Sequence, residues 1–432
     1  MVPAGSRSTG IERVGILGLG YVGLPLAVAF AEAGVKVVGV DADAEKVTAI
    51  NEGGSYIEDV PSESLAPLIR DGKIEASNEY AAFGEVDAVA ICLPTPLDEH
   101  GAPDLSFVIA GAEAAAEHVR PGALVVLEST TYPGTTREVL QPIFKRSGRT
   151  VGEDVFLAFS PERVDPGNRR HTLWNTPKIV GGLTPACTRK AEDLYAPIVE
   201  EVYTVSSPES AEMSKLLENI FRGVNIALVN ELALLCDRMG IDVWEVIDAA
   251  KTKPFGFMPF YPGPGLGGHC IPIDPFYLSW RARAFDGNAE FIELAGRINS
   301  SMPYYACSKI TAALNYQQKP VNGSRVLLLG VSYKPNVSDL RESPATRILD
   351  LLASSGASVV YHDPHVPDLP DNKLSSVDLT TRELEQSDCV VIVTDHDVFD
   401  FRFVTDHAPR VVDLRNAVRR TLGELPANVD VL

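Results

Sequence analysis

Cys270 stands in a glycine-rich segment whose residue types suit covalent catalysis. The segment runs from Gly263 to Pro275 and reads GPGLGGHCIPIDP. A thiol captures an aldehyde as a thiohemiacetal that can then be oxidised, and neighbouring glycines let the backbone approach a bulky substrate. Asp274, followed by Pro275, has the pattern of a helix start. The alternative is a buried cysteine in a Gly/Pro turn, so a second indication is needed.

The second indication is a glycine pattern near the N-terminus, GLGYVG at residues 18–23. Residues 14–17 predict a strand before it, a helical stretch that ends near Gly34 follows, and residues 37–41 predict a second strand that ends at Asp41. This order is the dinucleotide fingerprint, in which an acid binds the ribose diol. Asp41 favours NAD over NADP, because a 2′-phosphate would meet a carboxylate. The residues expected to contact NAD here are Gly18, Gly20, Tyr21, Val22, Gly23, Asp41 and Lys46.

Two further apolar runs, residues 86–93 and 123–128, predict buried parallel strands. Each ends in a polar loop, and these loops contain Thr95 and Thr131. Ligands of doubly wound sheets bind at the carboxyl ends of the strands, so we expect both threonines to contact cofactor or substrate. The alternative is that these are ordinary loops between strands and helices.

Residues 208–240 predict one long helix. Its apolar residues at helical spacing are Met213, Leu216, Leu217, Ile220, Phe221 and Val224. Three polar residues, Lys215, Asn219 and Arg222, fall at i, i+4 and i+7 and so share one face. A solvated stripe and a functional face are both open interpretations, although asparagine is poorly favoured inside a helix.

A polar stretch at residues 317–323 predicts a linker, and a second α/β unit follows it. Strands are expected near residues 326–330, 359–363, 390–393 and 411–414, with a helix at residues 344–354. This unit lacks the glycine fingerprint. Its first loop, residues 331–343, instead carries Lys334 and Arg341, whose positive charges suit a nucleotide diphosphate.

Composition indicates a large α/β enzyme. The chain has 432 residues, of which 45% are hydrophobic, and this predicts two or three domains with ample cores. A net charge of −20 argues against nucleic-acid and membrane partners. The six cysteines show no paired spacing, so we expect neither disulfides nor a metal site, and a cytoplasmic location fits. No run of about eighteen apolar residues and no signal-peptide core is visible.

The chain resembles the UDP-glucose/GDP-mannose dehydrogenase family from about Ile11 to Leu432. The matching motifs are GLGYVGLPLA, LPTPL, STTYPGTT, SPER, the Lys215–Asn219 helix, PGPGLGGHCIPIDP and SYKPNVSDLRES. The resemblance implies two Rossmann-like, doubly wound parallel-sheet domains joined by a long central helix. It implies an NAD-binding domain at residues 11–207, a central helical domain with the cysteine loop at 208–316, and a UDP-sugar-binding domain at 321–432.

The resemblance also implies a reaction, the oxidation of a nucleotide-sugar 6-hydroxyl to a carboxylate with two NAD, in an enzyme that is at least a homodimer. Cys270 is then the nucleophile, Asp274 a partner in water or proton handling, and Lys215 and Asn219 the stabilisers of the oxyanion. Glu162 and Thr131 organise acid–base chemistry and water, and which carboxylate is the base stays open. The residues implied to contact NAD also include Thr95, Thr131 and Arg341. Substrate contacts are implied for Glu162, Arg163, Lys215, Asn219, Arg222, Phe260, Tyr261, Gly267 and Lys334.

Residues 251–261 and His269 resemble the branch of the family that acts on N-acetylated sugars, particularly UDP-N-acetylglucosamine. UDP-N-acetylmannosamine is the closest alternative, because the two sugars differ only in where the C2 amide points, and UDP-glucose is a further one. An NAD-binding regulator without catalysis is the alternative from another class. The intact set of Lys215, Asn219, Cys270 and Asp274 argues against it.

Overall fold

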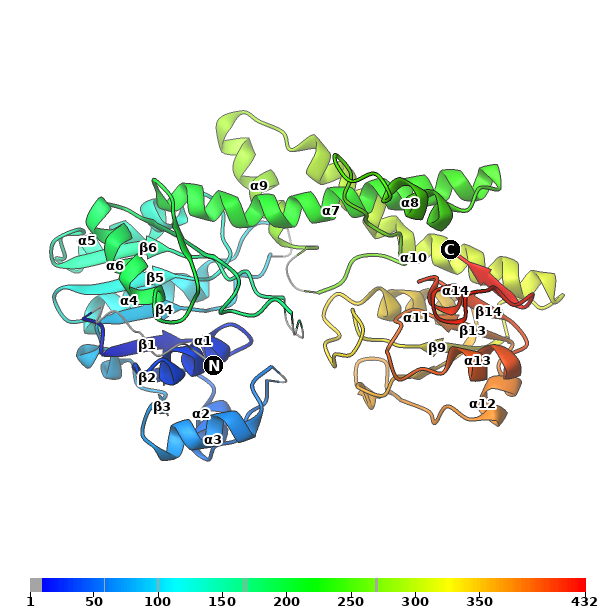
Figure 1. Cartoon of the computed structure of the whole chain (residues 1–432), viewed down its shortest axis with the longest axis horizontal. Coiled ribbons are helices and arrows are strands. Elements are labelled where there is room, and N and C mark those ends of the chain that lie inside the picture. The colour runs from blue at the N-terminus through cyan, green and yellow to red at the C-terminus, as the bar shows by residue number, and fades with distance from the viewer. Residues whose placement is uncertain (1–9, 58, 99–100, 166–167, 169, 269–270) are drawn as a thin grey trace. The chain divides into compact units, whose positions relative to one another are not determined.

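The computed structural model describes residues 10–57, 59–98, 101–165, 168, 170–268 and 271–432. The chain divides into two compact units, each built around its own sheet (Figure 1). The first unit contains Met1–Glu218 and Trp280–Gly287, and the second contains Asn219–Ser279 and Asn288–Leu432. The fold class predicted from the sequence, α/β with Rossmann-like sheets and a long helix, is confirmed. The division into three domains stays a prediction.

The first unit holds an eight-stranded sheet in the order β3-β2-β1-β4-β5-β6-β7-β8. Its strands are β1 (Arg13–Leu17), β2 (Lys36–Val40), β3 (Ile74–Ser77), β4 (Ala88–Ile91), β5 (Ala123–Leu127), β6 (Val155–Phe159), β7 (Lys178–Gly182) and β8 (Val202–Thr204). Its helices are α1 (Gly23–Glu32), α2 (Ala44–Asn51), α3 (Ser62–Arg70), α4 (Ser106–His118), α5 (Gln141–Arg146) and α6 (Pro185–Tyr195). The strands predicted at both polar loops and at the glycine pattern are therefore present.

The two faces of this sheet bury separate apolar clusters, because successive side chains of a strand point to opposite sides. Along β5, Leu124 and Val126 pack with α1, α3 and α6, whereas Val125 and Leu127 pack with α4 and α5. Helices therefore cover both faces, as expected for a doubly wound sheet.

One pair of neighbouring strands departs from the all-parallel expectation. β6 and β7 run antiparallel, and β8 then pairs parallel with β7. No helix lies between β6 and β7 in the described residues, and an antiparallel pair needs no crossover helix. The first residue of β7, Lys178, consequently enters the sheet beside the carboxyl ends of the earlier strands.

The long helix α7 (Pro208–Met239) is present as predicted, but its apolar residues do not all face a core. Leu216 is buried, whereas Met213, Leu217 and Phe221 are 37%, 59% and 46% exposed. Apolar residues therefore occupy two faces of this helix, one buried and one exposed. Three helices follow it, α8 (Val243–Ala250), α9 (Asp274–Ala282) and α10 (Glu290–Tyr316).

The second sheet has five parallel strands in the order β10-β9-β13-β14-β15. They are β9 (Arg325–Leu329), β10 (Ser358–His362), β13 (Cys389–Ile392), β14 (Val411–Asp413) and β15 (Val429–Val431). The helices are α11 (Pro344–Ser354), α12 (Thr381–Gln386), α13 (Phe401–His407) and α14 (Ala417–Leu422), and a small hairpin pairs β11 (Asp368–Leu369) with β12 (Leu374–Ser375). All four strands predicted after the linker are confirmed, as is the helix at 344–354.

Candidate functional site

The loop between β1 and α1 forms a cradle that fits a dinucleotide pyrophosphate. Gly18 has a φ of +91°, and a Cβ on Gly23 would stand 1.8 Å from the carbonyl oxygen of Gly18, so neither position accepts a side chain. A Cβ on Gly20 would meet nothing within 4 Å, which leaves space above the loop. The loop is fixed to the second strand, because the Leu19 amide donates to Asp41 Oδ2 at 2.8 Å. The predicted glycines and Asp41 therefore come together in one site.

The other residues predicted to contact NAD from this part of the chain are Tyr21, Val22 and Lys46. Tyr21 is 45% exposed, and Val22 directly precedes α1. Lys46 Nζ lies 3.8 Å from Asp43 Oδ2 and 5.9 Å from the ring centre of Tyr56. Tyr56 was missed from the sequence, although its hydroxyl donates to the Leu19 carbonyl at 2.7 Å and so helps to hold the cradle.

The loops after β4 and β5 are joined to each other through the first of the two predicted threonines. Thr95 Oγ1 donates to the carbonyl oxygen of Thr130 at 2.8 Å. Thr131 is fully buried, and its Oγ1 has no hydrogen-bond partner among the residues that the structure describes. A buried hydroxyl normally finds a partner, so Thr131 is the member of this loop that can hold a bound water or substrate group.

Glu212 on α7 anchors the far end of the loop that carries Thr131. It is fully buried and accepts hydrogen bonds from the Gly134 amide at 2.6 Å and the Thr136 amide at 2.9 Å. Burial raises the pKa of Glu212 to about 7, and these hydrogen bonds only partly oppose the rise. Sequence reasoning missed this residue, although an acid among apolar helix positions was a visible signal.

Glu162 lies in the loop after β6 with its carboxylate oriented by backbone donors. Its Oε1 accepts the amides of Arg163 and Val164 at 2.7 and 2.6 Å, and its Oε2 lies 3.5 Å from Lys178 Nζ. Burial raises the pKa of Glu162, but Lys178, Lys215 and the backbone amides lower it further, so that the pKa lies below its usual value. Glu162 is therefore an ionised carboxylate at neutral pH.

Lys215 lowers the pKa of Glu162 from its position on α7. Arg163 does not point its guanidinium at solvent, because Nε and Nη2 contact Glu218 Oε1 at 2.9 and 2.6 Å and Nη1 donates to the Pro177 carbonyl. The first unit thus brings Glu162, Lys215 and Arg163 together.

In the second unit, two residues that were predicted separately, Asn219 and Asp274, are in direct contact. Asn219 Nδ2 donates to Asp274 Oδ2 at 2.6 Å, and the two residues are 5% and 4% exposed. A helix was expected to start at Asp274-Pro275, and helix α9 begins at Asp274. The asparagine of the long helix is therefore buried and hydrogen-bonded, and it is no part of a solvated stripe.

The glycine segment packs against the loop that follows β9. A Cβ on Gly267 would stand 2.6 Å from Tyr333 Cβ, and one on Gly268 would stand 2.8 Å from the Tyr333 ring. The Gly268 amide also donates to the Arg341 carbonyl at 2.9 Å. These contacts explain why the segment needs glycine. Cys270 and His269 lie outside the described residues, so their predicted roles stay predictions.

Two predicted basic residues lie in the loop after β9, and a third basic residue, which follows β14, was missed. Arg341 pairs with Asp339, and Lys334 lies 5.6 Å from the ring centre of Tyr333. The missed residue is Arg415, whose Nε donates to the Val393 carbonyl at 2.8 Å. Arg415 Nη1 lies 2.7 Å from where a Cβ on Gly263 would stand, so it borders the glycine segment. Its sequence signal was a basic residue directly after a strand.

The second sheet carries an acid where the first carries Asp41, but its site is closed. Asp363 follows β10, and its Oδ2 accepts the Val331 amide at 2.7 Å, as Asp41 accepts Leu19. The ring of His396 lies 3.0 Å from the same oxygen, and Asp363 is 2% exposed. No ribose can reach this carboxylate, which agrees with a nucleotide site of another kind in the second unit.

Three predicted substrate contacts lie near the middle of α7 and after α8. Arg222 is exposed on α7. Phe260 packs edge-on against Phe221, with ring centres 5.7 Å apart. Tyr261 stacks on Trp244 at 5.8 Å, and its hydroxyl donates to Asp248 at 3.1 Å. The two aromatic rings are therefore packed against neighbours within the second unit.

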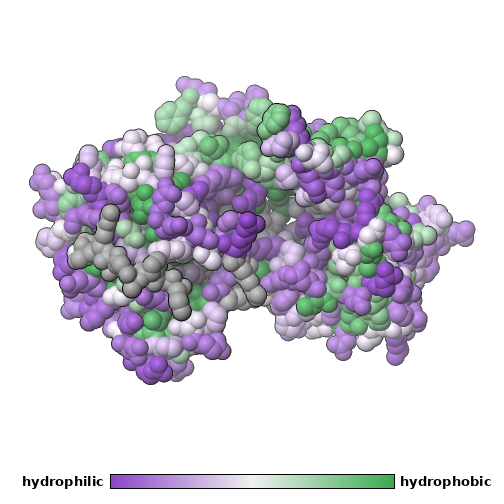
Figure 2. Space-filling model, in the orientation of Figure 1, coloured by the Kyte–Doolittle hydropathy of each residue, from purple (hydrophilic) through white to green (hydrophobic). Residues whose placement is uncertain are grey.

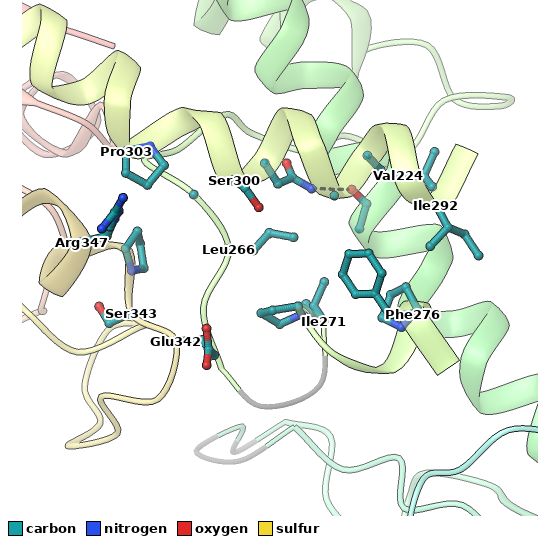
Figure 3. A pocket seen from close by; sticks show the side chains of 18 of the residues that line it. Val224, Leu266, Ile271, Phe276, Ile292, Ser300, Pro303, Glu342, Ser343 and Arg347 are labelled. Atoms are coloured by element: carbon teal, nitrogen blue, oxygen red, sulfur yellow. Dashed lines mark hydrogen bonds between the residues drawn. The ribbon is translucent and has the colours of Figure 1, made fainter. Parts of the chain in front are cut away.

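A cavity of about 480 Å³ lies behind the glycine segment (Figure 3). Leu266 and Ile271, which flank His269 and Cys270 in the sequence, line it together with Phe276 and Val224. Arg347 and Tyr304 also line it, and the guanidinium of Arg347 donates to the Tyr304 hydroxyl. The wall is mainly apolar, so the cavity supplies packing space beside the segment and no cluster of catalytic groups.

Comparison with known proteins identifies the family. The chain matches the family model for the NAD-binding domain of the UDP-glucose/GDP-mannose dehydrogenase family at residues 12–199. It also matches the models for the family's central domain at residues 209–301 and for its UDP-binding domain at residues 327–420. The three matches follow the order and positions of the motifs described above.

Individual relatives share about a third of their residues with this chain. It is 37% identical to UDP-N-acetyl-D-mannosamine dehydrogenase of Methanococcus maripaludis, over 90% of this chain and 87% of that protein. It is 36% identical to UDP-N-acetyl-D-glucosamine 6-dehydrogenase of Pseudomonas aeruginosa, over 82% and 83%. The solved structure of UDP-D-ManNAc dehydrogenase from Pyrococcus horikoshii matches with a TM-score of 0.88 at 33% identity, over 97% of this chain and 98% of that one. The chain therefore belongs to the UDP-glucose/GDP-mannose dehydrogenase family and is an NAD-dependent oxidoreductase that acts on a nucleotide sugar.

Proposed function

We propose that this enzyme oxidises the 6-hydroxyl of a UDP-N-acetylhexosamine to the uronate, with UDP-N-acetylglucosamine as the expected substrate. The observation that carries the proposal is the buried contact between Asn219 and Asp274, four residues after Cys270. The contact holds a donor amide of α7 against a carboxylate of the segment that supplies the thiol. This set of groups is needed for an alcohol that is oxidised twice.

The first oxidation produces an aldehyde. When bound, NAD supplies the hydride acceptor. Glu162, kept ionised by its neighbours, accepts the hydroxyl proton directly or through a water held by Thr131. Lys215 and Asn219, one turn apart on α7, stabilise the negative charge that grows on the oxygen.

The second oxidation passes through the thiol. Cys270 adds to the aldehyde carbon, and its proton passes through a base of the site to the former carbonyl oxygen, so that a thiohemiacetal forms. Loss of a second hydride gives a thioester, which water hydrolyses to the acid and the free thiol. Asp274 and Glu162 are the carboxylates available to take a proton from that water. Each sugar consumed therefore requires two NAD and one water.

The nucleotide is proposed to bind the second unit. Lys334 and Arg415 carry positive charge beside the glycine segment, and Gly267 keeps the backbone open next to Tyr333. A guanidinium suits the diphosphate because it offers several donors in a fixed plane. The closed carboxylate of Asp363 agrees with a uridine nucleotide at this sheet and NAD at the other.

UDP-N-acetylmannosamine is the second candidate substrate. Relatives at 37% and 36% identity are named for the mannosamine and the glucosamine compound respectively, so the two sugars are about equally supported by kinship. UDP-glucose ranks only third. It lacks an N-acetyl group, whereas residues 251–261 resemble the branch that acts on N-acetylated sugars.

We also propose that the enzyme is a homodimer that pairs through α7. One face of this helix presents an apolar stripe, defined as Met213, Leu217, Phe221, Leu228, Leu232, Leu235 and Met239, and every member is at least 37% exposed. Figure 2 shows hydrophobic side chains gathered near the upper edge, where α7, α8 and α10 lie in Figure 1. So large an exposed apolar surface marks an interface.

Within the described residues, α7 is also the one helix long and apolar enough to cross a membrane, although 33% of its apolar window is buried in the structure. Dimer contact is the better account of this helix, because its polar residues Glu212 and Asn219 are buried and hydrogen-bonded to other segments of the chain. A cytoplasmic location agrees with the five described cysteines, all of which are free thiols.

A panel of UDP- and GDP-sugars tests the proposal. The expected result is two NADH for each sugar consumed, with a uronate as product and a higher kcat/KM for UDP-N-acetylglucosamine than for UDP-glucose. One NADH per sugar with release of aldehyde contradicts the mechanism. No turnover of any sugar, with NAD binding retained, would favour the regulator. Faster turnover of UDP-N-acetylmannosamine would select the second candidate.

A further inference from the structure

Lys178 is a buried cation that contacts two carboxylates in the first unit. It is the first residue of β7 and is 2% exposed. Its Nζ lies 2.6 Å from Glu128 Oε2 and 3.5 Å from Glu162 Oε2. The hydroxyl of Tyr195 donates to the other oxygen of Glu128, and the ammonium lies 5.1 Å from the Tyr195 ring centre. Lys178 is thereby fixed on one side and touches Glu162 on the other.

Fold stability alone does not account for this arrangement. Burying two charges costs several kcal/mol each, and an apolar pair of similar volume often serves a fold as well. The cluster also lies at the carboxyl end of the sheet, since Glu128 directly follows β5 and Glu162 follows β6. Ligands of such sheets bind at that edge. A charged interior at this position therefore calls for a functional reason.

The charges that face Glu162 come from several elements. Lys178 approaches from β7, Lys215 from α7 and Glu128 from the end of β5. Cys92, after β4, is a neutral thiol, because burial and then Glu128 raise its pKa well above the usual value. Tyr195 stays protonated for the same two reasons. The neighbouring Arg163 is engaged by Glu218.

Two cations, Lys178 and Lys215, consequently act on Glu162, and they differ in how deeply they are buried. Burial lowers the pKa of Lys178, but Glu128 and Glu162 raise it further, so its charge is permanent. Lys215 is only partly buried and is the group proposed to stabilise the substrate oxygen. When Lys215 turns to that oxygen, Lys178 is the cation that stays on Glu162.

We propose that Lys178, held by Glu128 and Tyr195, is a positioning residue that fixes the Glu162 carboxylate and keeps it an anion during catalysis. The inference rests on the proposed function, in which Glu162 handles a proton. The inference adds Lys178 as the residue that keeps Glu162 ionised independently of Lys215. Lys178 touches neither substrate nor cofactor in this account and acts only through Glu162.

The test compares variants through the pH dependence of kcat/KM, which reports groups of the free enzyme. Lys178→Met alone leaves Glu128 as an unpaired buried charge and would impair folding. The informative variant is therefore Lys178→Met combined with Glu128→Gln, which removes both charges and keeps similar volumes. Its acidic limb is expected to move up by about 1 pH unit or more, within the range that an opposite charge at this separation supplies.

Two controls separate positioning from structure. Lys178→Arg keeps a cation at this position. Its acidic limb is expected to lie closer to that of the wild type than to that of the double variant. Lys190→Met removes a lysine of α6 that bonds the Gly122 carbonyl, and it should leave the limb unmoved. A folded double variant with the wild-type acidic limb would overturn the proposal, whatever its melting temperature.

A readout without turnover keeps this inference distinct from the proposed function. The infrared carbonyl band of a protonated carboxyl is followed with pH in the double variant, with and without Glu162→Gln. We expect a band that is lost with Glu162→Gln and that titrates at higher pH than in the wild type. An unchanged titration overturns the inference even if the enzyme oxidises sugars. A shifted titration supports the effect on Glu162 even if no sugar in the panel is oxidised.

Discussion

Asn219 and Asp274, 55 residues apart in the chain, share a hydrogen bond of 2.6 Å in a buried setting. Asn219 lies on α7 and Asp274 is the first residue of α9, so the contact ties the long helix to the segment that carries the thiol. The donor is the asparagine amide, and this orients the whole side chain. An aspartate would place two carboxylates at the same distance, and neither would supply a donor.

Asn219→Asp is therefore expected to lower kcat by about 100-fold or more, the usual effect of removing one donor from an oxyanion site. The new carboxylate also repels Asp274, so the melting temperature should fall. Steady-state NADH formation with saturating sugar and NAD measures the first effect, and differential scanning fluorimetry measures the second.

Asn225→Asp is the matched control, because it makes the same change on the same helix. Asn225 bonds the Phe221 carbonyl near the surface and is given no role in the chemistry. It is expected to keep kcat within about twofold. If Asn219→Asp behaved like this control, the pair with Asp274 would be structural only.

Asp41→Asn should weaken NAD binding and leave the chemistry intact at saturating cofactor. The amide oxygen can still accept the Leu19 N–H, so the cradle is retained, but the charge that favours a ribose diol is lost. We expect KM for NAD to rise about tenfold, which corresponds to ~1.4 kcal/mol, with kcat nearly unchanged. A lowered kcat at saturating NAD would show that Asp41 also shapes the reacting end of the site.

Much of the fold follows from local patterns in the sequence. The strand before Gly18, the loops with Thr95 and Thr131, and the helix at 344–354 all come from short-range rules of periodicity and turns. The antiparallel pairing of β6 and β7 does not, because nothing local in β7 specifies which way it enters the sheet. The exposed face of α7 was missed for a related reason. Apolar spacing marks burial but does not distinguish a core from a partner subunit.

The site was predictable by residue type and less so by contact. Asn219 was found as a misfit in a helix, whereas its bond to Asp274 depends on how α7 and α9 pack. The pairing of Lys178 with Glu128 and Glu162 joins residues up to 50 positions apart, and an isolated lysine at a strand start gives no signal. Arg415 and Tyr56 were missed because their roles come from tertiary contacts with glycine loops.

Lys215→Ala and Cys270→Ala should separate the two oxidations. Lys215→Ala removes the charge that faces the first oxyanion, so the rate of the first hydride transfer should fall by about 100-fold. Cys270→Ala should abolish formation of the acid and keep binding of NAD and nucleotide sugar, because no thioester can form. Single-turnover absorbance at the NADH band and product analysis by mass spectrometry distinguish the two. Near-normal formation of uronate by Cys270→Ala would show that Cys270 is a packed thiol and not the nucleophile.

Leu228→Glu with Leu232→Glu should dissociate the proposed dimer. Both residues belong to the apolar stripe of α7 and are 52% and 41% exposed, so the charges cost little in a monomer and much in an apolar interface. Sedimentation velocity should show a shift from dimer to monomer. Phe107→Glu on α4, at a residue that is 50% exposed and outside the stripe, is the control and should leave the oligomer intact. A wild-type monomer at micromolar concentration would contradict the dimer itself.

Glu212 makes the stability of the first unit depend on pH in a direction opposite to that of an ordinary paired carboxylate. Burial raises the pKa of Glu212 to about 7 in the folded chain, from 4.5. The folded state therefore binds a proton more tightly than the unfolded state between these values, and stability falls as pH rises through this window. The full effect is about 3 kcal/mol, since one pKa unit is worth about 1.4 kcal/mol.

Glu212→Gln removes this titration and keeps an acceptor for the Thr136 amide. The measured quantity is the difference in melting temperature between wild type and variant from pH 5 to pH 8, because other titrating groups cancel in that difference. We expect the wild type to lose stability relative to the variant as pH rises, mostly between pH 5 and 7. Because Glu212 holds the loop that carries Thr131, kcat of the variant should fall even where its stability is higher. A difference that stays flat with pH would mean that the hydrogen bonds to Glu212 keep it ionised throughout, and that the loop is anchored by a carboxylate anion.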